Sequence, residues 1–204
     1  MNRWTRISLL IVFTLVFGII AFFHESRLGK WIDNEVYDFI YASESFITTS
    51  IMLGATKIGE VWDMLCLSLT LVAYLMLKRY QIETLFFAIA MGLSSILNPV
   101  LKNIFDRERP TLLRLIDISG FSFPSGHAMG ATSYFGSIIY ILNRHDSGIS
   151  KGVLIGLSAL FILLISTSRV YLGVHYPTDI IAGIIGGAFC IVLSTLILKK
   201  QLAI

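Results

Sequence analysis

Residues 153–198, VLIGLSALFILLISTSRVYLGVHYPTDIIAGIIGGAFCIVLSTLIL, decide the fold of this chain. Two apolar runs, 153–168 and 180–198, flank a short segment that carries an arginine, a histidine and an aspartate. A helix needs about 17–25 apolar residues to cross the hydrocarbon core of a bilayer, and both runs reach or approach that length. Because backbone polar groups in lipid must be satisfied within the segment, both runs predict membrane helices.

The same pattern continues toward the N-terminus. Further apolar segments lie at about 7–23, 61–77, 84–101 and 127–142, and loops with charged or turn residues separate them. Neither an internal repeat nor an interdomain linker is visible in the sequence. We therefore predict an all-α integral membrane bundle of six transmembrane helices, formed by a single domain over residues 1–204.

Composition supports the same class of protein. Of 204 residues, 55% are hydrophobic and 14% are charged, and the mean hydropathy is +0.78. Soluble domains carry about 25% charged residues, so the composition argues for a membrane protein. The net charge of +3 gives no indication of nucleic-acid binding. No Cys-x-x-Cys pair or histidine-rich cluster predicts a structural metal.

The N-terminal segment resembles a signal peptide only in part. Arg3 and Arg6 precede the apolar run 7–23, but no small-residue cleavage pattern follows it. We therefore predict that this segment is retained as the first membrane helix.

The placement of Lys and Arg predicts the orientation in the cell membrane. With a cytoplasmic N-terminus, the cytoplasmic side holds Arg3, Arg6, Lys78, Arg79, Arg144, Lys151, Lys199 and Lys200. The other side holds Arg27, Lys30, Lys57, Lys102, Arg107, Arg109, Arg114 and Arg169. The two sets are equal in size, but the first lies in very short loops, where positive charge most strongly favours the cytoplasm. We predict that both termini are cytoplasmic and that the loops of the second set face outward.

The first long loop, residues 24–60, contains Trp31, Ile32, Val36 and Phe39 at near-helical spacing. An amphipathic helix lying in the membrane interface has this pattern. A second apolar stretch, 46–58, is too short to span. Two interpretations remain open: a lid that packs on the bundle, or a surface that guides a lipid headgroup.

Three polar motifs fall at the ends of apolar segments. They are Lys102 with Arg109-Pro110, then Pro124-Ser125-Gly126-His127, then Ser168-Arg169 with His175 and Asp179. All of them lie in or beside the loops that follow the third and fifth segments. Those loops share one side of a six-helix bundle whatever its orientation, so one site can use all three motifs.

The first two motifs suit a phosphate. Arginine can bind phosphate oxygens in pairs, and lysine adds a point charge. A Ser-Gly turn at a helix start offers a hydroxyl, close backbone approach and free N–H groups to an anion. Read alone, Lys102 to Arg109 is also typical of a solvated charge cluster, and Ser125 to His127 of a simple turn and cap.

The third motif combines a cation with a histidine and a carboxylate. Arg169 ends an apolar helix, where an arginine is costly unless it has a partner or snorkels to the interface. Asp179 falls in the first turn of the next helix and can reach back to His175, which would fix the tautomer of the ring. A helix cap would also explain Asp179. We interpret the remaining histidines, His24 and His145, as surface residues.

Together, these motifs resemble the signature of the type 2 phosphatidic acid phosphatase superfamily, which shares its site with vanadium haloperoxidases and class A acid phosphatases. Every signature position is filled. Chain size and the long first loop are similar to the bacterial branch of phosphatidylglycerophosphatases B and undecaprenyl pyrophosphate phosphatases.

The resemblance implies a role for each residue. His175 would be the nucleophile and form a phosphohistidine, Asp179 would orient it, and His127 would protonate the leaving oxygen and then activate water. The phosphate would be held by Lys102, Arg109, Ser125, Gly126 and Arg169. Such a site needs neither metal nor cofactor.

The expected function is therefore a membrane lipid phosphatase. Phosphatidylglycerol phosphate is the first candidate substrate, with undecaprenyl pyrophosphate, phosphatidic acid and diacylglycerol pyrophosphate as others. A non-catalytic lipid-phosphate transporter or binding protein is the main alternative, and a vanadate-dependent oxidase is a third. The oligomeric state stays open, because the Gly183-xxx-Gly187 pair suits packing inside the bundle as well as dimerisation.

Overall fold

The structure is a computed structural model that describes residues 2–111, 114–145 and 149–198. Within these ranges it contains helices and no strand. The helices are α1 (Arg3–Phe23), α2 (Arg27–Tyr41), α3 (Phe46–Ile58), α4 (Val61–Leu77), α5 (Gln81–Phe105), α6 (Gly126–His145), α7 (Ile149–Tyr171) and α8 (Pro177–Ile197). The Lys199-Lys200 pair used above to predict the orientation lies outside the described residues.

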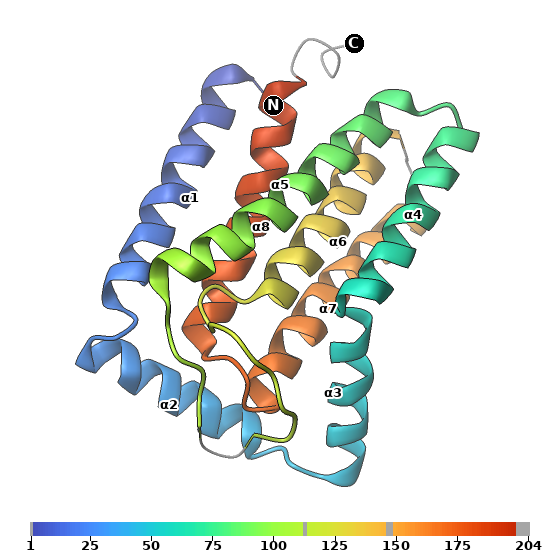
Figure 1. Cartoon of the computed structure of the whole chain (residues 1–204). Coiled ribbons are helices and arrows are strands. Elements are labelled where there is room, and N and C mark those ends of the chain that lie inside the picture. Colours follow the sequence, from blue (N-terminus) through green and yellow to red (C-terminus); the bar gives the residue numbers. More distant parts are fainter. Residues whose placement is uncertain (1, 112–113, 146–148, 199–204) are drawn as a thin grey trace.

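Figure 1 shows how the bundle is arranged. The start of α1 and the end of α8 lie at one end, and the loops that precede α6 and α8, which carry motif residues, lie at the other, next to α2. Helix α6 is central, since it packs against α5, α7 and α8. A core of buried apolar side chains includes Phe86, Phe87, Tyr134, Phe135 and Ile165. The motif loops therefore rest on a packed bundle that fixes their positions.

Four helices are long and apolar enough to cross a membrane: α1, α5, α7 and α8. A fifth span results if α3 and α4, which are bent by 59° at their junction, are taken as one. Helix α6 covers another predicted segment but is less apolar, because it carries Thr132, Ser133 and Ser137, all buried among neighbouring helices. The chain is thus an all-helical, multi-pass membrane protein, and six spans remain a prediction.

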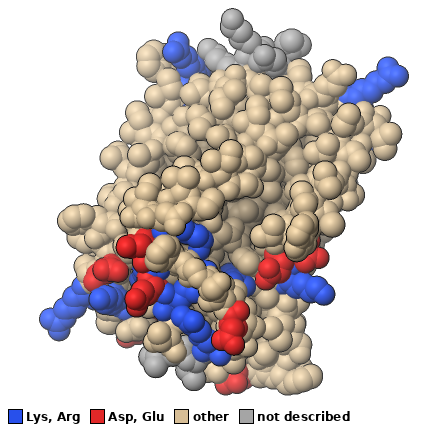
Figure 2. Space-filling view, viewed as in Figure 1, with Lys and Arg blue, Asp and Glu red and all other residues tan. Residues whose placement is uncertain are grey.

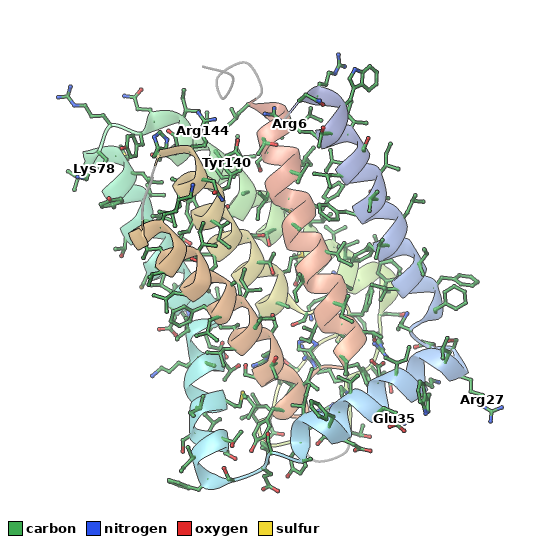
Figure 3. The ribbon with its side chains drawn as sticks, turned by 180° about the vertical axis from the view of Figure 1, so that it is seen from behind. Arg6, Arg27, Glu35, Lys78, Tyr140 and Arg144 are labelled. Atoms are coloured by element: carbon green, nitrogen blue, oxygen red, sulfur yellow. The ribbon has the colours of Figure 1, made fainter. Side chains whose placement is uncertain are left out.

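The first long loop is largely helical. Helix α2 begins after Ser26, whose hydroxyl accepts a hydrogen bond from the Gly29 N–H. The helix exposes Leu28, Trp31 and Phe39, whereas Asp33 on its other face is buried. It packs against α7 and α8 and crosses the end of the bundle, as its labelled residues Arg27 and Glu35 show in Figure 3. An amphipathic helix in this place suits the membrane interface, and its action as a lid remains a prediction.

The two glycines of the Gly-xxx-Gly pair pack inside the chain. A Cβ atom on Gly183 would lie 2.6 Å from the Ser125 carbonyl oxygen, and one on Gly187 would lie 2.7 Å from the Met129 carbonyl oxygen. These approaches are closer than a side chain allows, so glycine lets α8 lie directly against the start of α6. Packing within the bundle therefore accounts for the pair, and it sets the position of the Ser125-Gly126 turn.

Candidate active site

Charged side chains gather at the end of the bundle that carries the motifs, below a broad uncharged surface (Figure 2). This end contains α2, the segment between α5 and α6, and the short loop between α7 and α8. Although far apart in the sequence, the three motifs converge here. The site therefore lies where the apolar part of the molecule meets its polar end.

His175 and Asp179 form a buried pair. Proline at the first position of α8 starts the helix, and Asp179 in its first turn accepts a hydrogen bond from the Tyr176 N–H at 2.9 Å. The same oxygen, Oδ2, lies 3.3 Å from His175 Nδ1. Both side chains are almost fully buried, with exposed fractions of 2% and 0%. The start of α8 thus holds the Asp179 carboxylate beside Nδ1 of the imidazole ring.

The hydrogen bonds around the ring favour one tautomer. Ser122 Oγ donates to Asp179 Oδ2 at 2.5 Å and lies 3.2 Å from His175 Nδ1. Both neighbours of Nδ1 can accept, so the network assigns the proton to Nδ1 and leaves a lone pair on Nε2. On that side, Arg109 Nη1 lies 3.1 Å from Nε2. The lone pair therefore faces a cation that can also hold a phosphate oxygen.

Burial lowers the pKa of His175 to about 4, even though the hydrogen bond and charge of Asp179 raise it; Arg109 and Lys102 lower it further. An exposed histidine has a pKa near 6.5 and would be largely protonated at pH 5.5. His175 should instead be neutral there, and only a neutral ring has the lone pair that attacks phosphorus.

We therefore expect imidazole ¹⁵N NMR of labelled protein in micelles to show a neutral Nδ1–H ring for His175 at pH 5.5. Protonation should begin only as the pH falls toward about 4. The His175→Gln variant assigns the resonance. An imidazolium signal at pH 5.5 would contradict both the assigned tautomer and the low pKa.

Three cations lie close enough to one or both histidines of the motifs to act on them by charge. Arg109 is anchored by hydrogen bonds from Nε to the Gly120 carbonyl and from Nη1 to the Val174 carbonyl, each at 2.8 Å. Lys102 donates to the Phe121 carbonyl, and Arg169 donates to Thr56 Oγ1. Arg169 is 1% exposed, and within the described part of the chain its Nε has no hydrogen-bond partner. A buried donor without a partner is costly, and a phosphate oxygen would satisfy it.

The Ser125-Gly126-His127 turn completes the enclosure. Ser125 is fully buried, and its N–H donates to the Asp179 carbonyl at 3.0 Å, which links the start of α6 to the start of α8. Gly126 is the first residue of α6, so the N–H groups of that helix start are available to bind an anion. His127 follows in the first turn. All eight residues that the sequence analysis selected thus lie at this end of the bundle.

Sequence reasoning missed three residues that hold this arrangement: Arg107, Asp33 and Ser122. Arg107 Nη1 donates to Asp179 Oδ1 at 2.6 Å, and its Nη2 donates to Asp33 Oδ2 at 2.7 Å. The Arg107 guanidinium also stacks 3.9 Å from the centre of the Tyr176 ring. In the sequence, Arg107 belongs to a cluster of charges that is typical of a solvated loop, and no local signal distinguishes it. The Ser-Phe-Pro-Ser-Gly context of Ser122 likewise gives no signal of a contact with Asp179.

The interpretation of His24 as a surface residue was wrong. Its relative exposure is 7%, and its ring stacks on Phe123 with the ring centres 4.9 Å apart. The loop after α1 turns inward because α2 folds back over the end of the bundle. His145 is exposed and lies far from the site, with its Nε2 2.7 Å from Glu83 Oε1.

A cleft of ≈ 450 Å³ opens beside His127 between α4, α5 and α6. Its lining is largely apolar and includes Val61, Met64, Leu65 and Met91. Gly126 and His127 also line it. The cleft therefore places apolar side chains next to a histidine of the site.

Comparison with known proteins gives concordant results. The PAP2 superfamily pattern matches residues 83–202. Phosphatidylglycerophosphatase B of Bacillus subtilis is 35% identical over 135 residues, which are 65% of this chain and 66%, just under two thirds, of that protein. Undecaprenyl-diphosphatase of Sulfolobus acidocaldarius is 25% identical over 94% of this chain and 88% of its own length.

Among solved structures, the chain is similar to the crystal structure of a transmembrane PAP2-type phosphatidylglycerolphosphate phosphatase from Bacillus subtilis. The TM-score is 0.84 with 28% sequence identity, and the match covers 94% of this chain and 96% of that one. The likeness thus extends over α1 to α8 and is not limited to the motifs.

Proposed function

Because this chain belongs to the PAP2 superfamily, we propose that it is a membrane lipid phosphatase that hydrolyses a terminal phosphate of a lipid through a phosphohistidine. The observation that carries the proposal is the His175 ring. Asp179 and Ser122 hold its Nδ1 side, and its Nε2 side faces Arg109. A merely phosphate-binding site needs cations, but it does not need an oriented nucleophile.

In the first step, Nε2 of His175 attacks phosphorus, and the bond from phosphorus to the leaving lipid oxygen breaks. Asp179 stabilises the positive charge that develops on the ring but keeps its own role as an acceptor. Arg109, Arg169 and Lys102, with the start of α6, stabilise the charge on the phosphoryl oxygens. His127 lies on the side of the apolar cleft, where it can protonate the leaving oxygen.

The cleft suggests how a lipid reaches this chemistry. An acyl chain can lie in it while the phosphate reaches the cations, so the substrate need not leave the bilayer. We propose phosphatidylglycerol phosphate as the first candidate substrate, since both the Bacillus subtilis relative and the similar crystal structure are named for that lipid phosphate. Undecaprenyl pyrophosphate is the second candidate, because the Sulfolobus relative is an undecaprenyl-diphosphatase.

The test measures phosphate release by purified protein in mixed micelles. The four lipids are phosphatidylglycerol phosphate, undecaprenyl pyrophosphate, phosphatidic acid and diacylglycerol pyrophosphate. We expect turnover in excess EDTA, because no three His, Cys, Asp or Glu side chains in the described ranges form a metal-binding group. Vanadate should inhibit, because it mimics the five-coordinate transition state. Binding without release would favour the non-catalytic alternative, and activity that requires added Mg²⁺ would contradict metal independence.

We further propose six membrane spans, with both termini in the cytoplasm and the site facing outward. Figure 3 supports a common side for the basic loops, since Arg6, Lys78 and Arg144 lie at the end opposite α2. Cysteines introduced singly as Ser119→Cys and Gln81→Cys, in a background without Cys66 and Cys190, test the orientation. An impermeant thiol reagent on intact cells should label the Ser119 variant, and the reverse pattern would invert the topology.

A further inference from the structure

The junction of α3 and α4, which we call the elbow (residues 56–61), lies against the proposed active site. The two helices bend by 59° there. A Cβ atom on Gly59 would lie 2.6 Å from His127 Cδ2 and 2.7 Å from Ile165 Cγ2. Only a residue without a side chain lets the elbow come this close, so Gly59 places its neighbours beside the His127 ring.

Two side chains of the elbow reach residues of the site. Thr56 Oγ1 accepts a hydrogen bond from Arg169. Glu60 Oε1 lies 3.6 Å from His127 Nε2, where the glutamate side chain is half-exposed and the histidine side chain is 15% exposed. Gly59 and Val61, on either side of Glu60, line the same cleft as His127. Glu60 therefore stands on the side from which the lipid leaves.

We propose that Glu60 is a positioning residue that acts through His127 and favours the imidazolium form required to protonate the leaving oxygen. This inference rests on the proposed phosphatase activity. Burial is the largest factor that disfavours a positive charge on the His127 ring, and four groups that face the ring add repulsion: Arg169 from α7, His175 when protonated, Arg109 from the loop after α5, and Lys102 from α5. A carboxylate at 3.6 Å offsets part of that repulsion.

The distance explains how Glu60 can act without blocking the reaction. At 3.6 Å it makes no hydrogen bond to the ring, and His127 Nε2 has no hydrogen-bond partner in the described part of the chain. The leaving oxygen can therefore take the Nε2 proton while Glu60 acts by its charge alone.

His127 loses one proton in the first step of the reaction and regains one in the second. In the first step, the N–P bond to His175 forms, the bond from phosphorus to the lipid oxygen breaks, and that oxygen receives the proton of His127. In the second step, water attacks phosphorus as the N–P bond breaks, and the proton of the water returns to His127. Glu60 gives and takes no proton in either step, so each cycle begins with the same imidazolium.

The experiment compares the pH dependence of kcat for wild type, Glu60→Gln and Glu60→Asp. Deprotonation of His127 sets the high-pH limb in this proposal. We expect Glu60→Gln to move that limb to lower pH by on the order of 0.5 units, with KM and the low-pH limb unchanged. At pH values above the limb, the kcat of Glu60→Gln should be about 3-fold lower than that of wild type. Glu60→Asp should recover part of this loss. Asp63→Asn, one turn further along α4, is the matched control and should follow wild type.

The possible outcomes separate this inference from the proposed function. An active wild type whose high-pH limb coincides with that of Glu60→Gln would overturn the inference and leave the phosphatase assignment intact. A loss of kcat that is equal at all pH values would indicate a structural role and would also overturn it. Absence of turnover by wild type on every lipid would instead remove the proposed function itself.

Discussion

Replacing His175 with alanine is expected to abolish turnover while the protein remains folded in detergent. The hydrogen bonds around Nδ1 leave the lone pair of the ring on Nε2, which lies 3.1 Å from Arg109 Nη1. Loss of a nucleophile typically costs several orders of magnitude, so we expect kcat to fall by on the order of 10⁴-fold or more. The measurement is phosphate release, followed by trapping of a ³²P-labelled phosphoenzyme with a rapid alkaline quench. Wild type should yield an acid-labile, base-stable adduct, and the variant should yield none.

The control for this experiment is His145→Ala, at the far end of α6, which should trap the phosphoenzyme normally. Vanadate binding to the His175 variant separates chemistry from site assembly, because Lys102, Arg109 and Arg169 stay in place. Turnover by His175→Ala within a few-fold of wild type would remove this residue from the nucleophile role and leave the cation cluster as a binding site.

The sequence predicted the helices and the motifs well because both depend on local patterns. Apolar runs set the helix positions, and Asp179 reaches back to His175 because it lies in the first turn of α8, which begins just after that histidine. The sequence placed His175, Asp179 and Arg169 at one end of the bundle for the same reason. It also predicted the segment that forms α6, although the buried hydroxyls of that helix make it less apolar than a lipid-facing helix.

Partners that come from other parts of the chain could not be predicted in this way. Asp33 and Arg107 are 74 residues apart, and a single sequence carries no sign that α2 folds back to bring them together. From the sequence, Glu60 likewise looks like an ordinary loop residue. The structure shows that Gly59 brings the elbow against His127. In each case a charged residue in a polar stretch is more often solvated, and only tertiary packing shows that it has a fixed partner.

Loss of Arg107 is the second large effect that we expect. Its side chain is 4% exposed and bridges two carboxylates, Asp33 and Asp179, which are 1% and 0% exposed. Arg107→Gln removes the shared cation and leaves both buried carboxylates without it. Breaking a buried ion pair in this way costs about 3–5 kcal/mol. We expect a clear fall in the thermal unfolding midpoint in detergent, together with a large fall in kcat, because Asp179 loses a contact that fixes its position.

A second substitution separates stability from positioning. Asp33→Asn combined with Arg107→Gln removes one of the two unpaired charges, so the unfolding midpoint should recover in part. Activity should not recover, because nothing in the double variant restores the Arg107 contact to Asp179. Arg107→Lys should remain impaired, since a single ammonium cannot replace two guanidinium nitrogens that bind two carboxylates. The matched control is Arg27→Gln, an exposed arginine on α2 (Figure 3), which should change neither quantity.

The result decides what α2 contributes to the site. Asp33 also accepts a hydrogen bond from the Thr178 N–H at 2.9 Å, in the first turn of α8, so α2 is tied to the helix that carries Asp179 both directly and through Arg107. If kcat recovers with stability in the double variant, Arg107 serves only to neutralise buried charge. If stability recovers and kcat does not, Arg107 orients the carboxylate that orients His175. In that case α2 is part of the catalytic support, since a shift of α2 would be transmitted through Asp33 and Arg107 to Asp179.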